Sequence, residues 1–173
     1  MRAQAQAQAG EIRLAYFDEV GFAQVHPNRS AWTVCGEQHC IDAPRGERLN
    51  VMGALFSDGS VMHSSRWCST TTELFLGFVT ELAKTVTKPL VILIDNASIH
   101  RARAIQPALR LLEKKGITLK FLPPYSPELN RIEKLWWLMK QRWMALTRRT
   151  KDELEQTVNH ILTNFGSQFQ MAF

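Results

Sequence analysis

Hydrophobic and polar residues alternate in several short segments of the first part of the chain. This alternation predicts strands, each bounded by polar or turn-forming residues, at Ile12–Phe17, Trp32–Cys35, Arg48–Phe56 and Ser60–Arg66. The dipeptide Asp58-Gly59 separates the last two segments and is typical of a tight hairpin turn. We therefore expect the chain to begin with antiparallel strands.

Further along the chain, strands and helices are expected to alternate. Leu90–Ile94 is apolar at every position, as in a central parallel strand, and Ile117–Phe121 predicts another strand. Ser/Thr-x-x-Glu capping boxes predict helix starts at Thr70–Glu73 and Thr150–Glu153. Apolar periodicity predicts two more helices, over Ala104–Lys115 and over Arg131–Leu146. This order indicates an α/β fold, with a mixed sheet flanked by helices.

Composition limits the classes of protein that remain. The 173 residues, 45% of them hydrophobic, are enough for one core without disulfides, and no apolar run is long enough to span a membrane. Residues 1–11 begin with alternating Ala and Gln, which predicts a disordered or linker tail, or the frayed end of a helix, before a domain at 12–173. The N-terminus lacks the apolar region of a secretory signal, so we expect a cytoplasmic protein. The net charge of +5 favours an anionic partner.

Cysteine and histidine side chains lie close together at Cys35, His39 and Cys40. Their spacing matches no compact zinc site, and no second pair of ligands follows. We therefore expect ordinary buried thiols here.

Two predicted strands lead directly into carboxylates, Asp18 and Asp95. A side chain at the carboxyl end of a strand points into the crevice where ligands bind in open α/β sheets. The alternative is that each Asp is a turn residue or a helix cap.

A third carboxylate, Glu133, borders the apolar stripe of the helix predicted at Arg131–Leu146. The stripe consists of Ile132, Leu135, Trp136, Met139, Trp143 and Leu146. Glu133 could reach over the edge of this packed face, or could be a solvent-facing residue favoured by the helix dipole. Three converging carboxylates would bind Mg²⁺ or Mn²⁺, and two such ions about 3.5–4 Å apart can promote phosphodiester cleavage.

Three blocks of the sequence resemble the signature blocks of the DDE transposases, in the bacterial insertion-sequence branch of the mariner superfamily. The blocks are Tyr16–Glu19, Asp95–His100 and Leu122–Trp136, and the last is long and specific. The resemblance implies a ribonuclease H-like fold with a five-stranded mixed sheet, and Asp18, Asp95 and Glu133 as the metal-binding catalytic triad. It also implies metal-dependent cleavage of transposon-end DNA, joining to target DNA, and a homodimer in the bacterial nucleoid.

The chain departs from the family pattern in two ways. The family usually has Pro where this chain has Arg131, so we expect a looser start to the helix that carries Glu133. The family's catalytic domain normally follows helix-turn-helix modules, and nothing upstream of Ile12 resembles one. We therefore expect such a module to be missing, or to be supplied by a separately encoded subunit.

Other polar residues receive supporting roles, each with a simpler alternative. Asn96 and His100 could contact water or phosphate near Asp95, or could be helix-start residues, and Glu19 should face away from Asp18. Asn130 is expected to cap the Glu133 helix. Basic residues interleaved with tryptophans can bind DNA or form a solvated helix face. The candidate DNA contacts are Arg131, Lys134, Trp137, Lys140, Arg148 and Arg149.

Two other functions remain open at this point. The chain could be a catalytically inactive transposase remnant that binds DNA or a partner subunit. It could also hydrolyse small phosphate compounds, although it has no Gly-rich phosphate loop.

Overall fold

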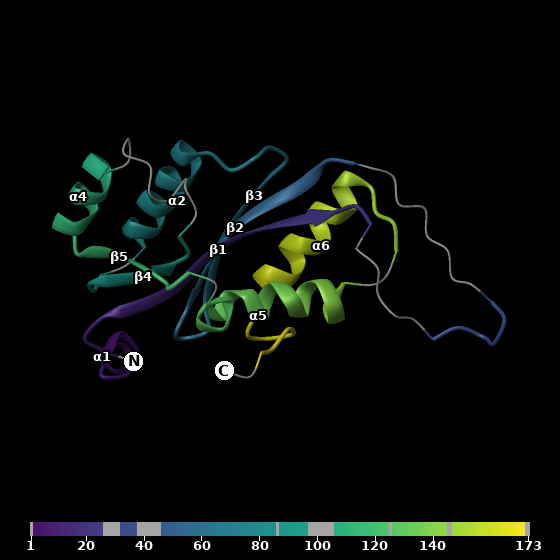
Figure 1. Ribbon diagram of the computed structural model, residues 1–173, viewed down its shortest axis with the longest axis horizontal. Coiled ribbons are helices and arrows are strands. Elements are labelled where there is room, and N and C mark those ends of the chain that lie inside the picture. The colour runs from purple at the N-terminus through teal and green to yellow at the C-terminus, as the bar shows by residue number, and fades with distance from the viewer. Residues whose placement is uncertain are drawn as a thin grey trace.

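A five-stranded mixed sheet forms the centre of the protein, in the order β3-β2-β1-β4-β5 (Figure 1). The computed structural model describes residues 2–25, 32–37, 46–85, 87–96, 106–124, 126–144 and 147–171. The first three strands are antiparallel, and β4 and β5 are parallel to β1. The strands are β1 (Arg13–Ala23), β2 (Arg48–Phe56), β3 (Val61–Arg66), β4 (Leu90–Ile94) and β5 (Ile117–Phe121). The predicted mixed sheet and the hairpin at Asp58-Gly59 are confirmed.

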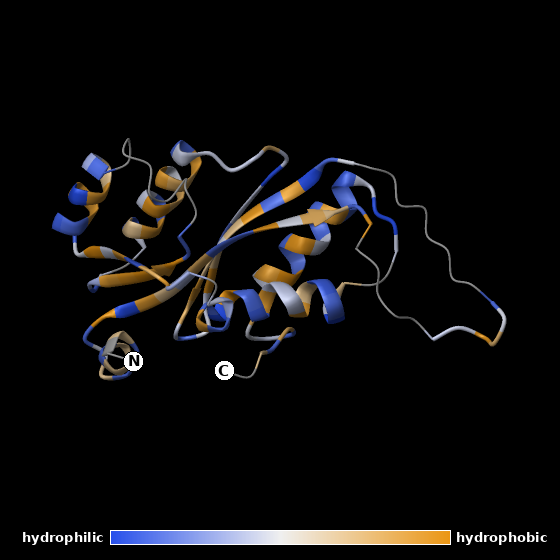
Figure 2. Cartoon of the chain, viewed as in Figure 1, coloured by the Kyte–Doolittle hydropathy of each residue, from blue (hydrophilic) through white to orange (hydrophobic). Residues whose placement is uncertain are grey.

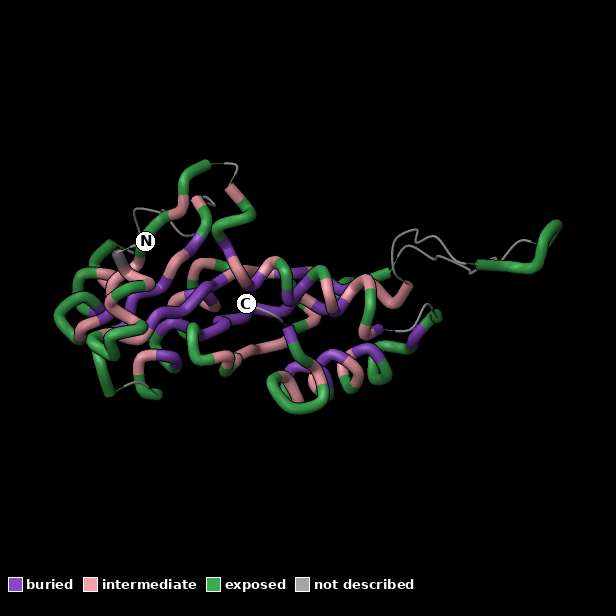
Figure 3. Tube along the Cα trace, turned by 90° about the horizontal axis from the view of Figure 1, so that it is seen from below, coloured by how far each residue is buried: buried purple, intermediate pink, exposed green. Residues whose placement is uncertain are grey.

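Helices cover both faces of this sheet (Figures 1 and 2). One hydrophobic cluster joins the sheet to α2 (Thr72–Lys84) and α4 (Gln106–Lys114). The other cluster joins it to α5 (Arg131–Leu138) and α6 (Lys151–Thr163). Buried residues are concentrated in the strands and on the inner sides of the helices (Figure 3). In the described part of the chain, no helix combines the length and apolar character needed to cross a membrane.

Alternation along β1 decides which layer each side chain joins. Leu14, Tyr16 and Val20 belong to the cluster under α5 and α6, whereas Ala15 and Phe17 belong to the cluster under α2 and α4. Because successive side chains of a strand point to opposite faces, Asp18 lies on the α5 face and Glu19 on the other.

Three expectations about the strands and caps are corrected by the structure. Strand β1 does not end before Asp18, because it continues to pair with β2, with Asp18 opposite Gly53. Residues 32–37 contain no strand, and Trp32 is fully exposed, since no neighbouring described strand satisfies the backbone there. Helix α2 is capped by Thr71, one residue later than predicted, whereas the Thr150 capping box forms as expected.

The N-terminal segment is helical and not a disordered tail. Helix α1 (Arg2–Gln8) packs Ala3 and Ala7 against the core of the α5 face. The Gln4 side-chain amide donates a hydrogen bond of 3.1 Å to the hydroxyl of Tyr16. The small alanine side chains are thus partly buried against the core, which the Ala/Gln composition did not indicate.

The predicted helix at Arg131–Leu146 changes its geometry part of the way along. It is α-helical to Leu138 and then continues as a π-helix over Met139–Trp143. The wider turn rotates the following residue, so that Met144 is 1% exposed and belongs to the core. An uninterrupted α-helix would have placed Met144 in the sector of Glu133. The predicted core residues Ile132, Leu135 and Trp136 are buried.

The close approach of α5 to the sheet depends on the missing side chain of Gly53. A Cβ atom at this position would lie 2.7 Å from two ring carbons of Trp136 and 3.1 Å from Cδ1 of Ile132. Real Cβ atoms do not come so close to a ring, so Trp136 or α5 would have to move.

We therefore expect Gly53→Ala to destabilise the protein by about 1–3 kcal/mol, as overpacking does in other cores. Chemical denaturation monitored by circular dichroism measures this free energy of unfolding. Gly77→Ala is the matched control, because Gly77 is on α2 and a Cβ added there would meet no atom within 4 Å. It should instead stabilise the helix, by about 0.5–1 kcal/mol. Equal effects of the two substitutions would contradict the role given to Gly53.

Candidate active site

Asp18 and Asp95 lie side by side at the point where β4 ends. The parallel register runs from Arg13 opposite Leu90 to Tyr16 opposite Leu93. Continuing that register places Asp18 level with Asp95, the first residue after β4. Strand β1 continues past the end of β4. Among the described strands it pairs there only with β2, so the edge of β1 that faced β4 has no strand beside it. Asp18 is half-buried and Asp95 is exposed, as expected for carboxylates that line an accessible crevice.

Glu133 is brought to the same place by an anchored helix start. A short 3₁₀ turn, Pro127–Leu129, leads into Asn130, whose carbonyl accepts a hydrogen bond of 3.0 Å from the N–H of Glu133. The side chain of Asn130 does not cap the helix, contrary to expectation. Its Nδ2 instead donates a buried hydrogen bond of 3.0 Å to the carbonyl of Phe17, the residue before Asp18. The first turn of α5 is therefore tied directly to β1.

The charges of the three predicted triad residues act on one another. Burial is the main cause that raises the pKa of Asp18 to about 7, against a hydrogen bond with the Glu19 backbone that lowers it. The charges of Glu133 and Asp95 raise that pKa further. Burial also raises the pKa of Glu133, and the charge of Asp95 is the next cause. Mutual repulsion of this kind is expected where carboxylates share a small volume without a cation.

The carboxylates do not already form a closed set of metal ligands. Within the described segments, no three His, Cys, Asp or Glu side chains are grouped so that they could hold a metal ion. Oxygen ligands are nevertheless the type that Mg²⁺ and Mn²⁺ bind, and a cation would relieve the repulsion that raises the pKa of Asp18. The chemistry of the donor set therefore fits a divalent cation.

Two of the three supporting residues lie near Asp95 in the structure. Burial and the charge of Asp95 raise the pKa of Glu19 to about 7, although Glu19 is on the opposite face of β1 from Asp18. Asn96 donates a hydrogen bond from Nδ2 to the carbonyl of Leu122, which joins the chain after β4 to the chain after β5. His100 lies outside the described residues.

The predicted DNA contacts separate into different environments. Arg131 begins α5 despite the absence of Pro, and its guanidinium lies over the ring of Tyr16 at 5.7 Å. Lys134 and Trp137 are exposed on the outer side of α5, and Arg148 is exposed near the start of α6. Arg149 is only 7% exposed and donates to the Thr147 carbonyl, so this conformation does not present it to DNA, contrary to expectation.

Lys140 lies deeper than a surface DNA contact would. It is half-buried, and its ammonium group is 5.4 Å from the ring centroid of Phe22, which shares the α5 face of β1 with Asp18. Burial lowers the pKa of Lys140 and the neighbouring charge of Arg48 lowers it further, whereas the charge of Asp18 raises it. Helical periodicity places Lys140 in the same sector as Glu133, at the edge of the packed face, which agrees with this position.

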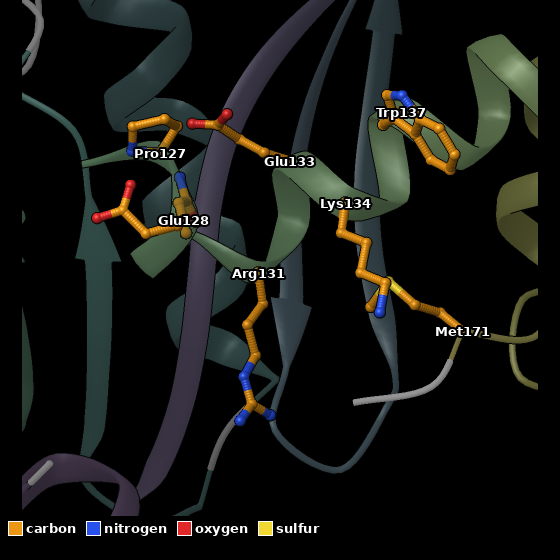
Figure 4. Close-up of a pocket in the computed structure, with 8 residues that line it drawn as sticks. Pro127, Glu128, Arg131, Glu133, Lys134, Trp137 and Met171 are labelled. Carbon is orange, nitrogen blue, oxygen red and sulfur yellow. The ribbon is translucent and has the colours of Figure 1, made fainter. Parts of the chain in front are cut away.

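A pocket of about 410 Å³ opens beside Glu133 (Figure 4). We call it the Trp137 pocket. Its lining comes from the 3₁₀ turn, from the outer side of α5 and from the C-terminal segment, as Pro127, Glu128, Asn130, Arg131, Glu133, Lys134, Trp137 and Met171. Sequence reasoning did not single out Pro127, which precedes α5 by four residues, or Met171, which only the folded chain brings next to α5.

The two described cysteines, Cys35 and Cys68, are exposed, so the expectation of buried thiols is wrong for Cys35. Trp32–Glu37, the described segment around Cys35, lacks the packing of a strand. His39 and Cys40 lie outside the described residues.

Comparisons with known proteins identify the family of the chain. Residues 13–155 match the family described as DDE superfamily endonuclease. The chain is 30% identical, over 132 residues, to the insertion element IS630 uncharacterized 39 kDa protein of Shigella sonnei. That match covers 74% of this chain but 38% of the Shigella protein.

Solved structures show the same fold at low sequence identity. The Mos1 transposase paired-end complex with the left transposon end superposes with a TM-score of 0.69 at 17% identity, over 97% of this chain and 52% of that one. The Mos1 mariner paired-end complex with Mn superposes with a TM-score of 0.70 at 16% identity, over 97% of this chain and 52% of that one. The catalytic core domain of BIV integrase superposes with a TM-score of 0.54 at 15% identity, over 94% of this chain and 87% of that domain.

The chain thus spans 38% of the Shigella relative and about half of the Mos1 chains that it resembles. Its sheet order and flanking helices are those of ribonuclease H-like catalytic cores. The chain therefore belongs to the DDE superfamily endonuclease family.

Proposed function

We propose that residues 12–173 form the catalytic domain of a transposase that cuts DNA strands and joins them to target DNA. The main support is electrostatic: the charges of Glu133 and Asp95 raise the pKa of Asp18, and the charge of Asp95 raises the pKa of Glu133. Membership of the DDE endonuclease family and the resemblance to Mos1 support the same reaction class.

The triad would hold Mg²⁺ or Mn²⁺, and two ions fit the proposed reaction best. Bound divalent ions activate the attacking oxygen and stabilise the leaving oxygen of a phosphodiester. One Mos1 neighbour is described as a complex with Mn and another as a complex with Mg, which supports these two metals. Asp18 and Asp95 would bind from adjacent strands, and Glu133 would complete the site from α5.

The chain's own residues would prepare the site in three ways. The hydrogen bond from Asn130 to Phe17 ties the start of α5 to β1, which limits how far Glu133 would have to move to reach a bound cation. Partial burial of Asp18 keeps bulk water from weakening the electrostatic interactions there. Exposed Lys134 and Arg148 would attract the DNA backbone without reading its sequence.

DNA ends are the proposed substrate, and a homodimer is the proposed working form. The Mos1 neighbours are described as paired-end complexes, one of them with the left transposon end. Two ends that are processed together require two active sites, which a symmetric dimer supplies.

Asp95→Asn tests the reaction directly. Loss of one metal-binding carboxylate should reduce Mn²⁺-dependent nicking of supercoiled plasmid by at least about a hundredfold. The matched control is Asp152→Asn, at an exposed position in the first turn of α6, which should nick like the wild type. Equal nicking by the wild type and Asp95→Asn would refute the proposed triad.

The raised pKa of Asp18 predicts how the stability of the metal-free protein depends on pH. An unfolded Asp ionises near 3.8, whereas folded Asp18 keeps its proton until about pH 7, so stability falls between these values as pH rises. In EDTA at pH 8, Asp18→Asn should therefore melt several degrees higher than the wild type, and the two should converge towards pH 4.

Adding metal should reverse this order of stability. Mn²⁺ at pH 8 should raise the melting temperature of the wild type but not that of Asp18→Asn, because binding to the folded state stabilises it. Asp152→Asn again serves as the control and should respond to Mn²⁺ like the wild type. A wild-type melting temperature that is the same with EDTA and with Mn²⁺ would contradict the metal site.

A further inference from the structure

The Trp137 pocket adjoins the proposed active site but is lined by a different kind of surface. Glu133 lies at its edge, and the rest of the lining is rich in carbon: the ring of Pro127, the indole of Trp137 and the thioether chain of Met171. The volume of about 410 Å³ falls within the range of small-molecule sites. A cation or a phosphate group alone gains nothing from such a lining, so the metal site does not account for it.

Trp137 is held in place and yet remains accessible. Its ring is 52% exposed, in contrast to Trp136, the preceding residue, which is 4% exposed in the core. The guanidinium of Arg142 lies over the Trp137 ring at 5.9 Å, one turn further along the helix. A large aromatic side chain that is oriented by a cation and left open to solvent provides a flat surface for stacking.

The charges around the pocket are divided between its two sides. Arg131 and Lys134 extend to one side of α5, whereas the carboxylates of Glu128 and Glu133 lie towards the other (Figure 4). A ligand with a flat apolar part and an attached phosphate could place its ring on Trp137 and its phosphate near the two cations. Repulsion by the carboxylates would keep that phosphate on the basic side.

We propose that the Trp137 pocket receives an unpaired nucleobase from the DNA strand next to the phosphate that is cut. This inference rests on the proposed function, since the neighbouring Glu133 is what links the pocket to strand cleavage. A base inside a duplex cannot reach a concave site, so the base must leave the stack. Stacking on Trp137 would offset part of that cost and would hold the strand in position beside the triad.

Binding of short fluorescein-labelled DNA to the full 173-residue chain tests the proposal. Fluorescence anisotropy at fixed salt compares a single-stranded oligothymidine with a fully paired duplex of equal length. All measurements are made in EDTA, where no cleavage occurs, so the result is independent of whether the triad is active. Circular dichroism verifies that each variant is folded.

Trp137→Ala should weaken binding of the single strand about tenfold, the typical loss for one stacked base, and change duplex binding less than about twofold. Trp137→Phe retains an aromatic face and should recover most of the lost affinity. Trp32→Ala removes another exposed tryptophan, in the segment Trp32–Glu37 remote from α5, and should bind both DNAs like the wild type.

Three results would overturn the proposal. These are unchanged single-strand binding by Trp137→Ala, an equal loss for the single strand and the duplex, and no recovery by Trp137→Phe. An equal loss would make Trp137 a general contact with the DNA backbone. If the wild type nicks plasmid with Mn²⁺ and the Trp137 variants give one of these results, the proposed function stands and only the base pocket is refuted.

Discussion

A single buried hydrogen bond, from Asn130 to the carbonyl of Phe17, links the element that carries the third carboxylate directly to the strand that carries the first. The two residues are 113 positions apart in the sequence, and each is within three residues of a predicted metal ligand. A bond of this kind contributes only about 1 kcal/mol net. Its main effect is geometric: it adds a local tie between β1 and the first turn of α5 to the packing of Ile132 and Trp136 against the sheet.

That contact holds together a site that is electrostatically unfavourable by itself. Asp18 is partly desolvated and faces the charges of Glu133 and Asp95, so its carboxyl binds a proton far more readily than a solvated Asp. The surrounding layers supply the compensation, because both faces of the sheet are packed against helices. A fold that tolerates such repulsion without a cation would gain stability from the proposed divalent cation, because the cation would relieve the repulsion.

Local signals predicted much of the fold and identified the candidate triad. Hydrophobic patterning predicted all five strands, four of them in nearly their observed positions and β1 with too early an end, and the Thr150 capping box began its helix where expected. The errors arose where distant residues decide the outcome. Asn130 is turned from a cap into an anchor by Phe17, and Arg149 is buried because the chain folds back on it. The Trp137 pocket also needs Met171, which no local pattern connects with α5.

The π-helix after Leu138 makes the number of residues in this segment a structural constraint in its own right. An α-helix with one residue fewer between Leu138 and Met144 could bury the same Met144 side chain. The chain instead carries an extra residue, which keeps Lys140 beside Phe22 and returns Met144 to the core. A deletion here would thus displace either a charge beside the proposed active site or a core side chain. Substitutions in this stretch should be tolerated much better than changes in its length.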